Sequence, residues 1–206
     1  MGRGHRHRAV PRSGGAVIGP GTSNPLTTCV FDLDGTLLDS DAALVRPFEI
    51  LGIAVAEVTF GHVLADECAR LGISVAAYLD AYDPSVAVPF PGVEDLVSAL
   101  DRWAVCSNKA ARSGRVELAR MGWKPEVALF TDDFGGPKHL GPVLEAMAIS
   151  ADEVIFVGDT AHDRRCAAAV GARFAVAAWN PRAEPEPGDI VLRTPADLLT
   201  HLAIPD

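Results

Sequence analysis

Two aspartates stand two positions apart where an apolar run of the chain breaks into a glycine turn. They are Asp32 and Asp34, within the segment VFDLDGT at residues 30–36. Adjacent carboxylates repel one another and cost desolvation energy when buried, so a purely structural strand rarely ends this way. The pair makes chemical sense where a metal ion offsets the charge and one carboxylate acts as a nucleophile. The segment therefore predicts a reactive, metal-associated turn.

Three further polar clusters each follow an apolar, strand-like run. They are Ser107-Asn108-Lys109, the loop that leads to Lys138, and the segment GDTAHD at 158–163, which contains Asp159 and Asp163. The carboxyl ends of parallel strands meet at one edge of a sheet, so all the clusters are expected there. Carboxylates for a hard metal ion, donors for phosphate oxygens and a nucleophile are the parts needed for phosphoryl transfer.

The elements that must position these clusters alternate along the chain. Strands are expected at 27–32, 103–107, 127–131, 154–158, 174–178 and 190–192, and helices at 92–102, 112–121, 139–148 and 163–170. A further capped helix is expected to start at Thr194-Pro195. Continuous apolar strands that alternate with helices are typical of an α/β fold with a doubly wound parallel sheet covered on both faces.

Two stretches interrupt this alternation. Residues 41–90 read as helical at 42–51, 61–71 and 75–82 and end in a proline-rich linker, which predicts a helical cap inserted after the first strand. The α/β core domain is then formed by 25–40 and 91–206. Residues 1–24 carry four arginines and no acid among many glycines, prolines and serines, so they are expected to form a disordered basic tail. This tail lacks the apolar core of a secretory signal.

Composition excludes several classes of function. The net charge of −9 argues against a nucleic-acid partner. No apolar run approaches the roughly 18 residues that span a bilayer, so no membrane partner is expected. The four cysteines form no CxxC pair, which disfavours zinc and favours reduced thiols and a cytoplasmic location. The expected partner is a small phosphorylated metabolite, and the chain is expected to be a monomer or a homodimer.

The four clusters, in their order, resemble the four motifs of the haloacid dehalogenase-like (HAD) superfamily, over residues 27–180. The DxDGT segment resembles motif I, Ser107-Asn108 motif II, Lys138 motif III and GDxxxD at 158–163 motif IV. One departure is His139, where many relatives have proline after the lysine. The chain is similar to phosphoglycolate phosphatase-like hydrolases with a helical cap. The resemblance implies a Rossmann-like core and a magnesium-dependent phosphatase that hydrolyses a small phosphomonoester through an aspartyl-phosphate.

The resemblance also implies roles for individual residues. Asp32 is the expected nucleophile and Asp34 the general acid and base. Mg²⁺ is expected on the Asp32 carboxylate, the backbone carbonyl of Asp34 and Asp159. Ser107, Asn108 and Lys138 are expected to hold the phosphate, with Asn108 contributing its backbone N–H. Thr36 is expected to support the turn, and Asp163 to orient Lys138 or a metal-bound water.

Other readings of the same residues remain open. Lys109 is expected to be a surface or supporting residue, and Trp179 a packing residue. A sugar phosphomutase would use the same two aspartates, and a non-catalytic phosphometabolite-binding module would share the fold. Dehalogenation is disfavoured because Asp34 is present, and Schiff-base chemistry is disfavoured because 41–90 contain no lysine. Phosphoglycolate, sugar phosphates and nucleotides all remain possible substrates.

Overall fold

A central parallel sheet organises the chain in the computed structural model, which describes residues 1, 26–59 and 63–202. The predicted basic tail, apart from Met1, lies outside the described residues. The six strands have the order β5-β4-β1-β6-β7-β8, and every neighbouring pair is parallel. The strands are β1 Thr28–Phe31, β4 Trp103–Cys106, β5 Val127–Leu129, β6 Val154–Gly158, β7 Arg173–Ala177 and β8 Ile190–Leu192. All six strands were predicted from the sequence, each to within two residues at its ends.

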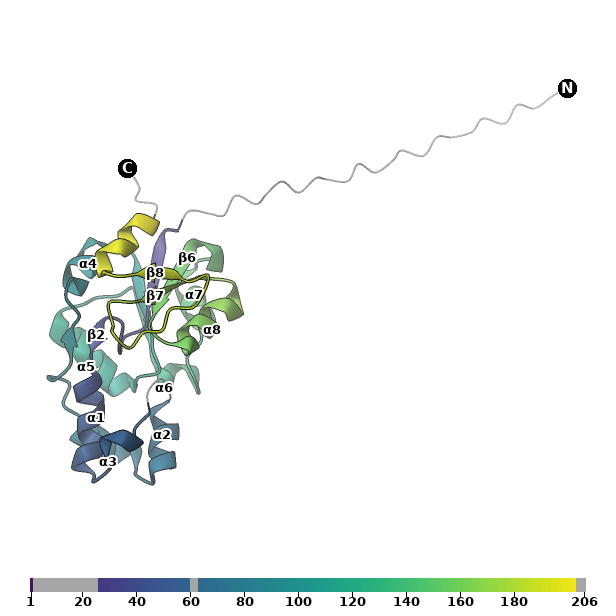
Figure 1. Cartoon of the computed structure of the whole chain (residues 1–206). Coiled ribbons are helices and arrows are strands. Elements are labelled where there is room, and N and C mark those ends of the chain that lie inside the picture. Colours follow the sequence, from purple (N-terminus) through teal and green to yellow (C-terminus); the bar gives the residue numbers. More distant parts are fainter. Residues whose placement is uncertain (2–25, 60–62, 203–206) are drawn as a thin grey trace.

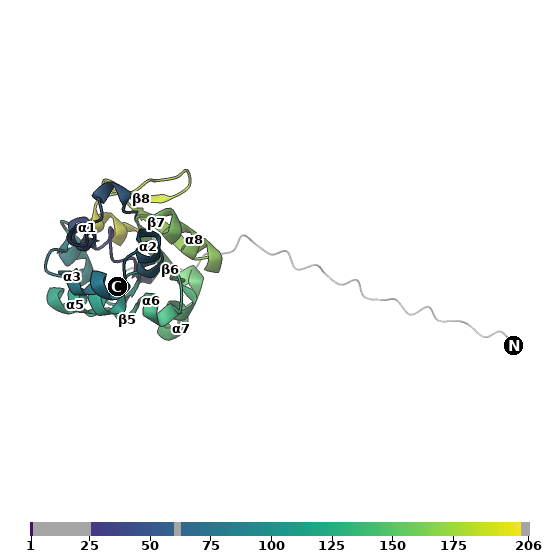
Figure 2. The same ribbon diagram turned by 90° about the horizontal axis from the view of Figure 1, so that it is seen from below.

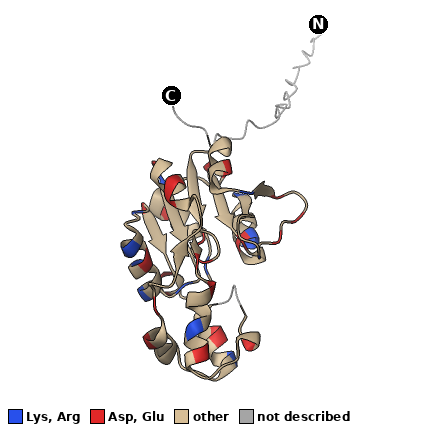
Figure 3. Cartoon of the chain, turned by 60° about the vertical axis from the view of Figure 1, so that its left-hand side comes forward, with Lys and Arg blue, Asp and Glu red and all other residues tan. Residues whose placement is uncertain are grey.

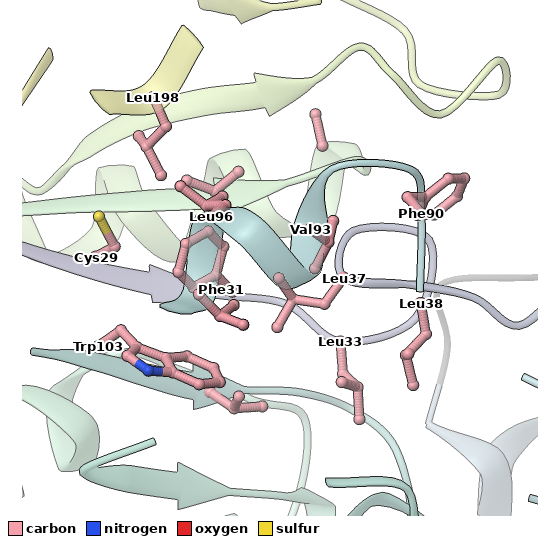
Figure 4. Close-up of a cluster of buried hydrophobic side chains, with 14 of the residues drawn as sticks. Cys29, Phe31, Leu33, Leu37, Leu38, Phe90, Val93, Leu96, Trp103 and Leu198 are labelled. Atoms are coloured by element: carbon pink, nitrogen blue, oxygen red, sulfur yellow. The ribbon is translucent and has the colours of Figure 1, made fainter. Parts of the chain in front are cut away.

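The strands are apolar throughout because both faces of the sheet are covered. In β1, Phe31 belongs to one buried cluster, whereas its neighbour Val30 belongs to another on the opposite face. Figure 4 shows the first cluster, in which Phe31 lies edge-on to Trp103 with ring centroids 6.0 Å apart. Charged residues therefore concentrate on helices and loops, and the strands are nearly free of them (Figure 3). The doubly wound α/β prediction is confirmed.

Helices cover the two faces in separate groups. The buried side chains of α4 Val93–Ala99, α5 Ala111–Met121 and the 3₁₀ helix Pro195–His201 join the Phe31 cluster. Those of α7 Gly141–Met147 and α8 Ala161–Val170 join the Val30 cluster. A short helix, α6 Thr131–Phe134, was not predicted. Within the described part of the chain, no helix is long and apolar enough to cross a membrane.

Helix ends differ from the predictions for local reasons. α8 begins two residues earlier than expected, because Thr160 is its N-cap and forms a reciprocal capping box with Asp163. It ends as predicted before Gly171, whose φ of +76° suits a left-handed cap. The predicted helix 92–102 begins after Gly92 and already ends at Ala99, and the predicted helix 139–148 begins only at Gly141.

The helical insertion leaves and rejoins the core at one place. The two-residue strands β2 Leu38–Asp39 and β3 Val88–Pro89 pair antiparallel, and the N–H of Phe90 donates to the carbonyl of Leu37. This small sheet was not predicted from the sequence. It brings the two ends of the intervening segment side by side, directly after the turn that carries Asp32 and Asp34.

The inserted segment forms its own helical layer. It contains α1 Asp41–Ile50, the 3₁₀ turn Val55–Glu57, α2 Leu64–Leu71 and α3 Val75–Ala81. The predicted helix 61–71 therefore begins only at Leu64 among the described residues. Phe48, Cys68 and Tyr78 form the centre of a separate apolar cluster. In Figures 1 and 2, α1, α2 and α3 lie together at one end of the sheet.

A buried carboxylate joins two parts of this layer. Glu67 on α2 accepts hydrogen bonds from the N–H and hydroxyl of Thr59, at 2.7 and 2.9 Å. Its side chain is 6% exposed and also pairs with Arg70 at 2.6 Å. The bonds from Arg70 and Thr59 outweigh the effect of burial and lower the pKa of Glu67 to about 2. The ionised carboxylate of Glu67 therefore links Thr59, in the segment before α2, to the helix α2.

We expect Glu67→Gln to destabilise the protein by about 1–2 kcal/mol at neutral pH, because a hydrogen-bonded charge is lost while Arg70 stays solvated. A lowered pKa stabilises the fold above the unfolded-state value, 4.5 for Glu67, and this contribution is lost as the pH falls toward about 2. The difference between wild type and variant should therefore be constant from pH 7 to 5 and shrink below about 4.5. Urea unfolding at each pH measures it, with the exposed Glu49→Gln as control. A difference that grows in acid would contradict this role of Glu67.

Candidate active site

The turn after β1 places its two aspartates at the end of the sheet that faces the helical insertion. The N–H of Asp32 donates to Val157 on the adjacent strand β6 at 2.9 Å, and the N–H of Leu33 donates to the carboxylate of Asp32 at 2.7 Å. Gly35 then turns the chain with a φ of +76°. A Cβ at this position would lie 2.3 Å from Asp159 Oδ2, so only glycine fits both the backbone and the space.

Lys138 is buried between two carboxylates. Its Nζ lies 2.8 Å from Asp32 Oδ2 and 2.6 Å from Asp163 Oδ1. Burial opposes the charge of the lysine, but Asp163 and Asp32 outweigh it and raise the pKa of Lys138. Burial raises the pKa of Asp32 to about 6, with Lys138 acting in the opposite direction. The sequence placed Asp32, Lys138 and Asp163 in one site, and the structure brings them into contact.

Asp163 has two sets of partners. One of its oxygens pairs with Lys138, and the other accepts hydrogen bonds from the N–H and hydroxyl of Thr160 at 2.9 and 2.6 Å. Lys138 and Thr160 together outweigh burial and hold the pKa of Asp163 below its usual value. The Cβ of any residue at Gly158 would lie 2.4 Å from Asp163, so a glycine is needed there. Asp163 was expected to orient either Lys138 or a metal-bound water, and the structure shows the contact with Lys138.

Asp159 completes an acidic cluster. One carboxylate oxygen from each of Asp32, Asp159 and Asp163 lies within 4.8 Å of the other two. Burial and the nearby Asp32 raise the pKa of Asp159 to about 7. A buried cluster of carboxylate oxygens, two of whose members have raised pKa values, fits a hard divalent cation such as Mg²⁺. The side chain of Asp34 is not one of these three, and the contribution of its backbone carbonyl to a metal site remains a prediction.

Asp34 is held by a buried lysine, and of the two places expected for this lysine the structure excludes the surface. Lys109 was expected at the surface or in support, but its side chain is only 3% exposed and its Nζ lies 2.7 Å from Asp34 Oδ1. The same Nζ lies 3.2 Å from Glu117 and 2.8 Å from the hydroxyl of Tyr82. Burial opposes the charge, but Asp34 and Glu117 outweigh it and raise the pKa of Lys109. Lys109 is therefore a buried supporting residue.

Glu117 and Tyr82 are site residues that the sequence analysis missed. Glu117 is fully buried on α5, and burial raises its pKa to about 7 despite the nearby Lys109. The Tyr82 hydroxyl donates to Glu117. Glu117 follows Gly114 by three residues on a helix whose inner face also holds Leu118. An acidic residue on the apolar face of a predicted helix indicates a buried carboxylate with a partner, so Glu117 could have been identified from the sequence. Tyr82, at the end of α3, gave no comparable one.

Ser107 and Asn108 lie at the end of β4. Ser107 is 1% exposed, and its hydroxyl accepts the N–H of Lys109 at 3.3 Å. The Asn108 side chain accepts the N–H of Lys138 at 2.7 Å, so it fixes the loop of that lysine. The binding of phosphate by the backbone N–H of Asn108 remains a prediction.

Trp179 and Asn180, which follow β7, form hydrogen bonds to the turn that carries Asp32. The indole of Trp179 donates to the carbonyl of Thr36 at 2.9 Å, so this residue does more than the predicted packing. Asn180 Nδ2 donates to Gly35 O and to Asp159 Oδ2, both at 2.9 Å. The hydroxyl of Thr36 lies 3.4 Å from Asp159. Asn180 was missed because asparagine before proline reads simply as a turn.

Part of this set lines one cavity of about 890 Å³, a volume that includes space open to solvent. At its floor are the residues expected to act on a phosphate: Asp32, Asp34, Ser107, Asn108, Lys138 and Asp159. Its opposite wall comes from the helical insertion. The arrangement offers a carboxylate able to attack phosphorus, cations and hydrogen-bond donors able to bind an anion, and a carboxylate cluster able to hold a metal ion, which together suit phosphoryl transfer.

Known proteins are similar to this chain in sequence and in fold. The sequence profile of the haloacid dehalogenase-like hydrolases matches residues 29–177. A phosphoglycolate phosphatase of Xylella fastidiosa is 30% identical, over 75% of this chain and 81% of its own. An N-acetylmuramic acid 6-phosphate phosphatase of Pseudomonas aeruginosa is 23% identical, over 86% and 95%. The crystal structure of a HAD-superfamily hydrolase from Geobacter sulfurreducens superposes with a TM-score of 0.64 at 19% identity, over 89% of this chain and 100% of the other.

Proposed function

Because the chain belongs to the haloacid dehalogenase-like hydrolases, we propose that it is a magnesium-dependent phosphatase that hydrolyses a small phosphomonoester through an aspartyl-phosphate on Asp32. The observation that carries the proposal is the convergence of Asp32, Asp34, Lys138 and Asp159 on one cavity. The resemblance of motifs gives Asp32 the role of nucleophile. Relatives whose names are those of phosphatases support the reaction class.

In the first step the Asp32 carboxylate attacks phosphorus, and the bond from phosphorus to the alcohol oxygen breaks. Asp34, held 2.7 Å from Lys109, donates a proton to the departing oxygen. In the second step a water attacks the aspartyl-phosphate, Asp34 takes up the proton of that water, and inorganic phosphate leaves. Such proton transfers contribute about 10²–10⁴-fold. Splitting one displacement into two lowers the barrier of each.

The other residues bind and orient. Lys138 keeps Asp32 ionised and offers its charge to the phosphate oxygens, with Ser107 and the N–H of Asn108 as further donors. Mg²⁺ would be held by the carboxylates of Asp32 and Asp159 and the carbonyl of Asp34. When bound, it supplies charge that offsets the repulsion between the phosphate and Asp32. Asp163 keeps Lys138 in place.

We expect thorough chelation to reduce phosphate release by at least about 10²-fold and added Mg²⁺ to restore it, because the carboxylate cluster would otherwise repel the phosphate. Release from a panel of phosphomonoesters, with and without chelator, measures this. Mg²⁺ should also raise the melting temperature, since it binds only the folded cluster. Full activity after chelation would remove the metal from the proposal. Exchange of phosphate between sugar positions, without net release, would identify a mutase instead.

A further inference from the structure

The part of the cavity that the helical insertion lines is mainly apolar and aromatic. Six side chains of the helical insertion form this wall: Leu44, Phe48, Val58, Leu64, Tyr78 and Tyr82. The rings of Phe48 and Tyr78 are tilted at 55° with centroids 4.7 Å apart, and those of Tyr78 and Tyr82 are stacked with centroids 6.1 Å apart. The alcohol half of a substrate bound at Asp32 would lie against this wall.

The polar atoms on this wall are already bonded within the protein. The Tyr78 hydroxyl donates to the carbonyl of Leu44 at 2.9 Å, and the Tyr82 hydroxyl is shared with Glu117 and Lys109. The carboxylate of Glu67, which also lines the cavity, is occupied by Thr59 and Arg70. The wall therefore offers a substrate apolar contact in place of hydrogen bonds.

Among the described residues that line the cavity, the cationic ones all belong to the α/β core. Lys109, Lys138 and Arg182 line it, and each is paired with a carboxylate: Lys109 with Asp34, Lys138 with Asp32 and Arg182 with Asp41. Of the described cap residues on the wall, none is cationic, and the charged one is the anion Glu67. A second acidic group on the substrate would therefore meet an apolar wall with no cation among its described residues, and its one charged residue, Glu67, is already paired with Arg70.

We propose that this chain prefers phosphate esters of uncharged alcohols that carry an aromatic ring, and that it discriminates against esters with a carboxylate in the leaving group. The inference rests on the proposed phosphatase function. Burying a carboxylate without a cation is costly, whereas burying a ring gains the transfer energy of its surface and contacts with Phe48 and Tyr78. The chain would thus differ from relatives named for phosphoglycolate.

A matched pair of substrates tests the preference. 4-Methylbenzyl phosphate and 4-carboxybenzyl phosphate share the bond that is cleaved and nearly the same shape, and they differ in charge at the far end. We expect kcat/KM to be at least about tenfold higher for the methyl compound. Leu64→Lys, and Val58→Lys as a second variant, should shift this ratio toward the carboxylate by tenfold or more. Leu79→Ala, a truncation in the same apolar cluster but outside the cavity wall, should leave the ratio unchanged.

Binding of the two corresponding benzylphosphonates, which are not hydrolysed, separates this inference from the proposed function. Tighter calorimetric binding of the methyl compound without turnover of either ester would support the pocket assignment and contradict the phosphatase. Turnover with equal or better use of the carboxylate would leave the phosphatase and overturn the inference. If neither phosphonate binds and neither ester is cleaved, both are overturned.

Discussion

Asp32→Asn is expected to abolish phosphate release, by about 10⁴-fold or more, while the protein remains folded. The amide keeps the size of the carboxylate and can still accept the N–H of Leu33, which the carboxylate accepts at 2.7 Å. It cannot act as the nucleophile. The substitution breaks the ion pair with Lys138, but Lys138 keeps Asp163 as its partner, and one of the crowded charges that raise the pKa of Asp159 is removed, so the protein should stay folded. Phosphate release and thermal unfolding measure the two effects.

A trapping experiment distinguishes a lost nucleophile from a distorted site. Acid quenching of the wild type during turnover should yield protein heavier by one phosphoryl group, and the variant should show none. Asp39→Asn is the matched control, because Asp39 is an exposed acid in the adjacent strand β2. Turnover that survives in Asp32→Asn would remove the covalent mechanism.

Lys138→Met is expected to cost both activity and about 3–5 kcal/mol of stability, because removing one partner of a buried ion pair leaves uncompensated charge. Asp163 is fully buried, and Asp32 lies on the other side of the lysine, so both would lose their counter-charge. The remaining carboxylates would then be harder to ionise. Urea unfolding and phosphate release measure the two losses.

The exposed Lys124→Met serves as control for the loss of a lysine as such. Adding Asp163→Asn to Lys138→Met should restore part of the stability, since the neutral amide can still cap α8, but none of the activity. Unchanged stability in Lys138→Met would mean that the ion pairs are not formed in solution.

The sequence predicted the sheet well because every strand is a continuous apolar run bounded by turns. It also predicted which residues meet at the sheet's edge, because parallel strands bring their carboxyl ends together whatever their distance along the chain. The contact of Lys138 with Asp32 and Asp163 follows from this rule. The roles assigned to these residues remain predictions.

The residues that support the site were harder to predict. Lys109 reaches Asp34 across 75 positions of the chain, and nothing in the polar segment SNK shows that its lysine turns inward. Asn180 bonds to Gly35 across 145 positions. Such contacts depend on side-chain direction within a fold, which local sequence does not encode. The strands β2 and β3 have two residues each, too few for any alternation to be visible.

The pairing of β2 with β3 has an evolutionary consequence. Because the segment between them starts and finishes at neighbouring points, the sheet is continuous without it, and its length is weakly constrained by the entropy of closing the loop. Insertions, deletions or replacements between Asp39 and Val88 that keep the hydrogen bonds of Tyr82 to Glu117 and Lys109 could therefore accumulate with little effect on the turn that carries Asp32 and Asp34. The lineage of this chain could have acquired new substrates by exchanging one module while retaining its chemistry.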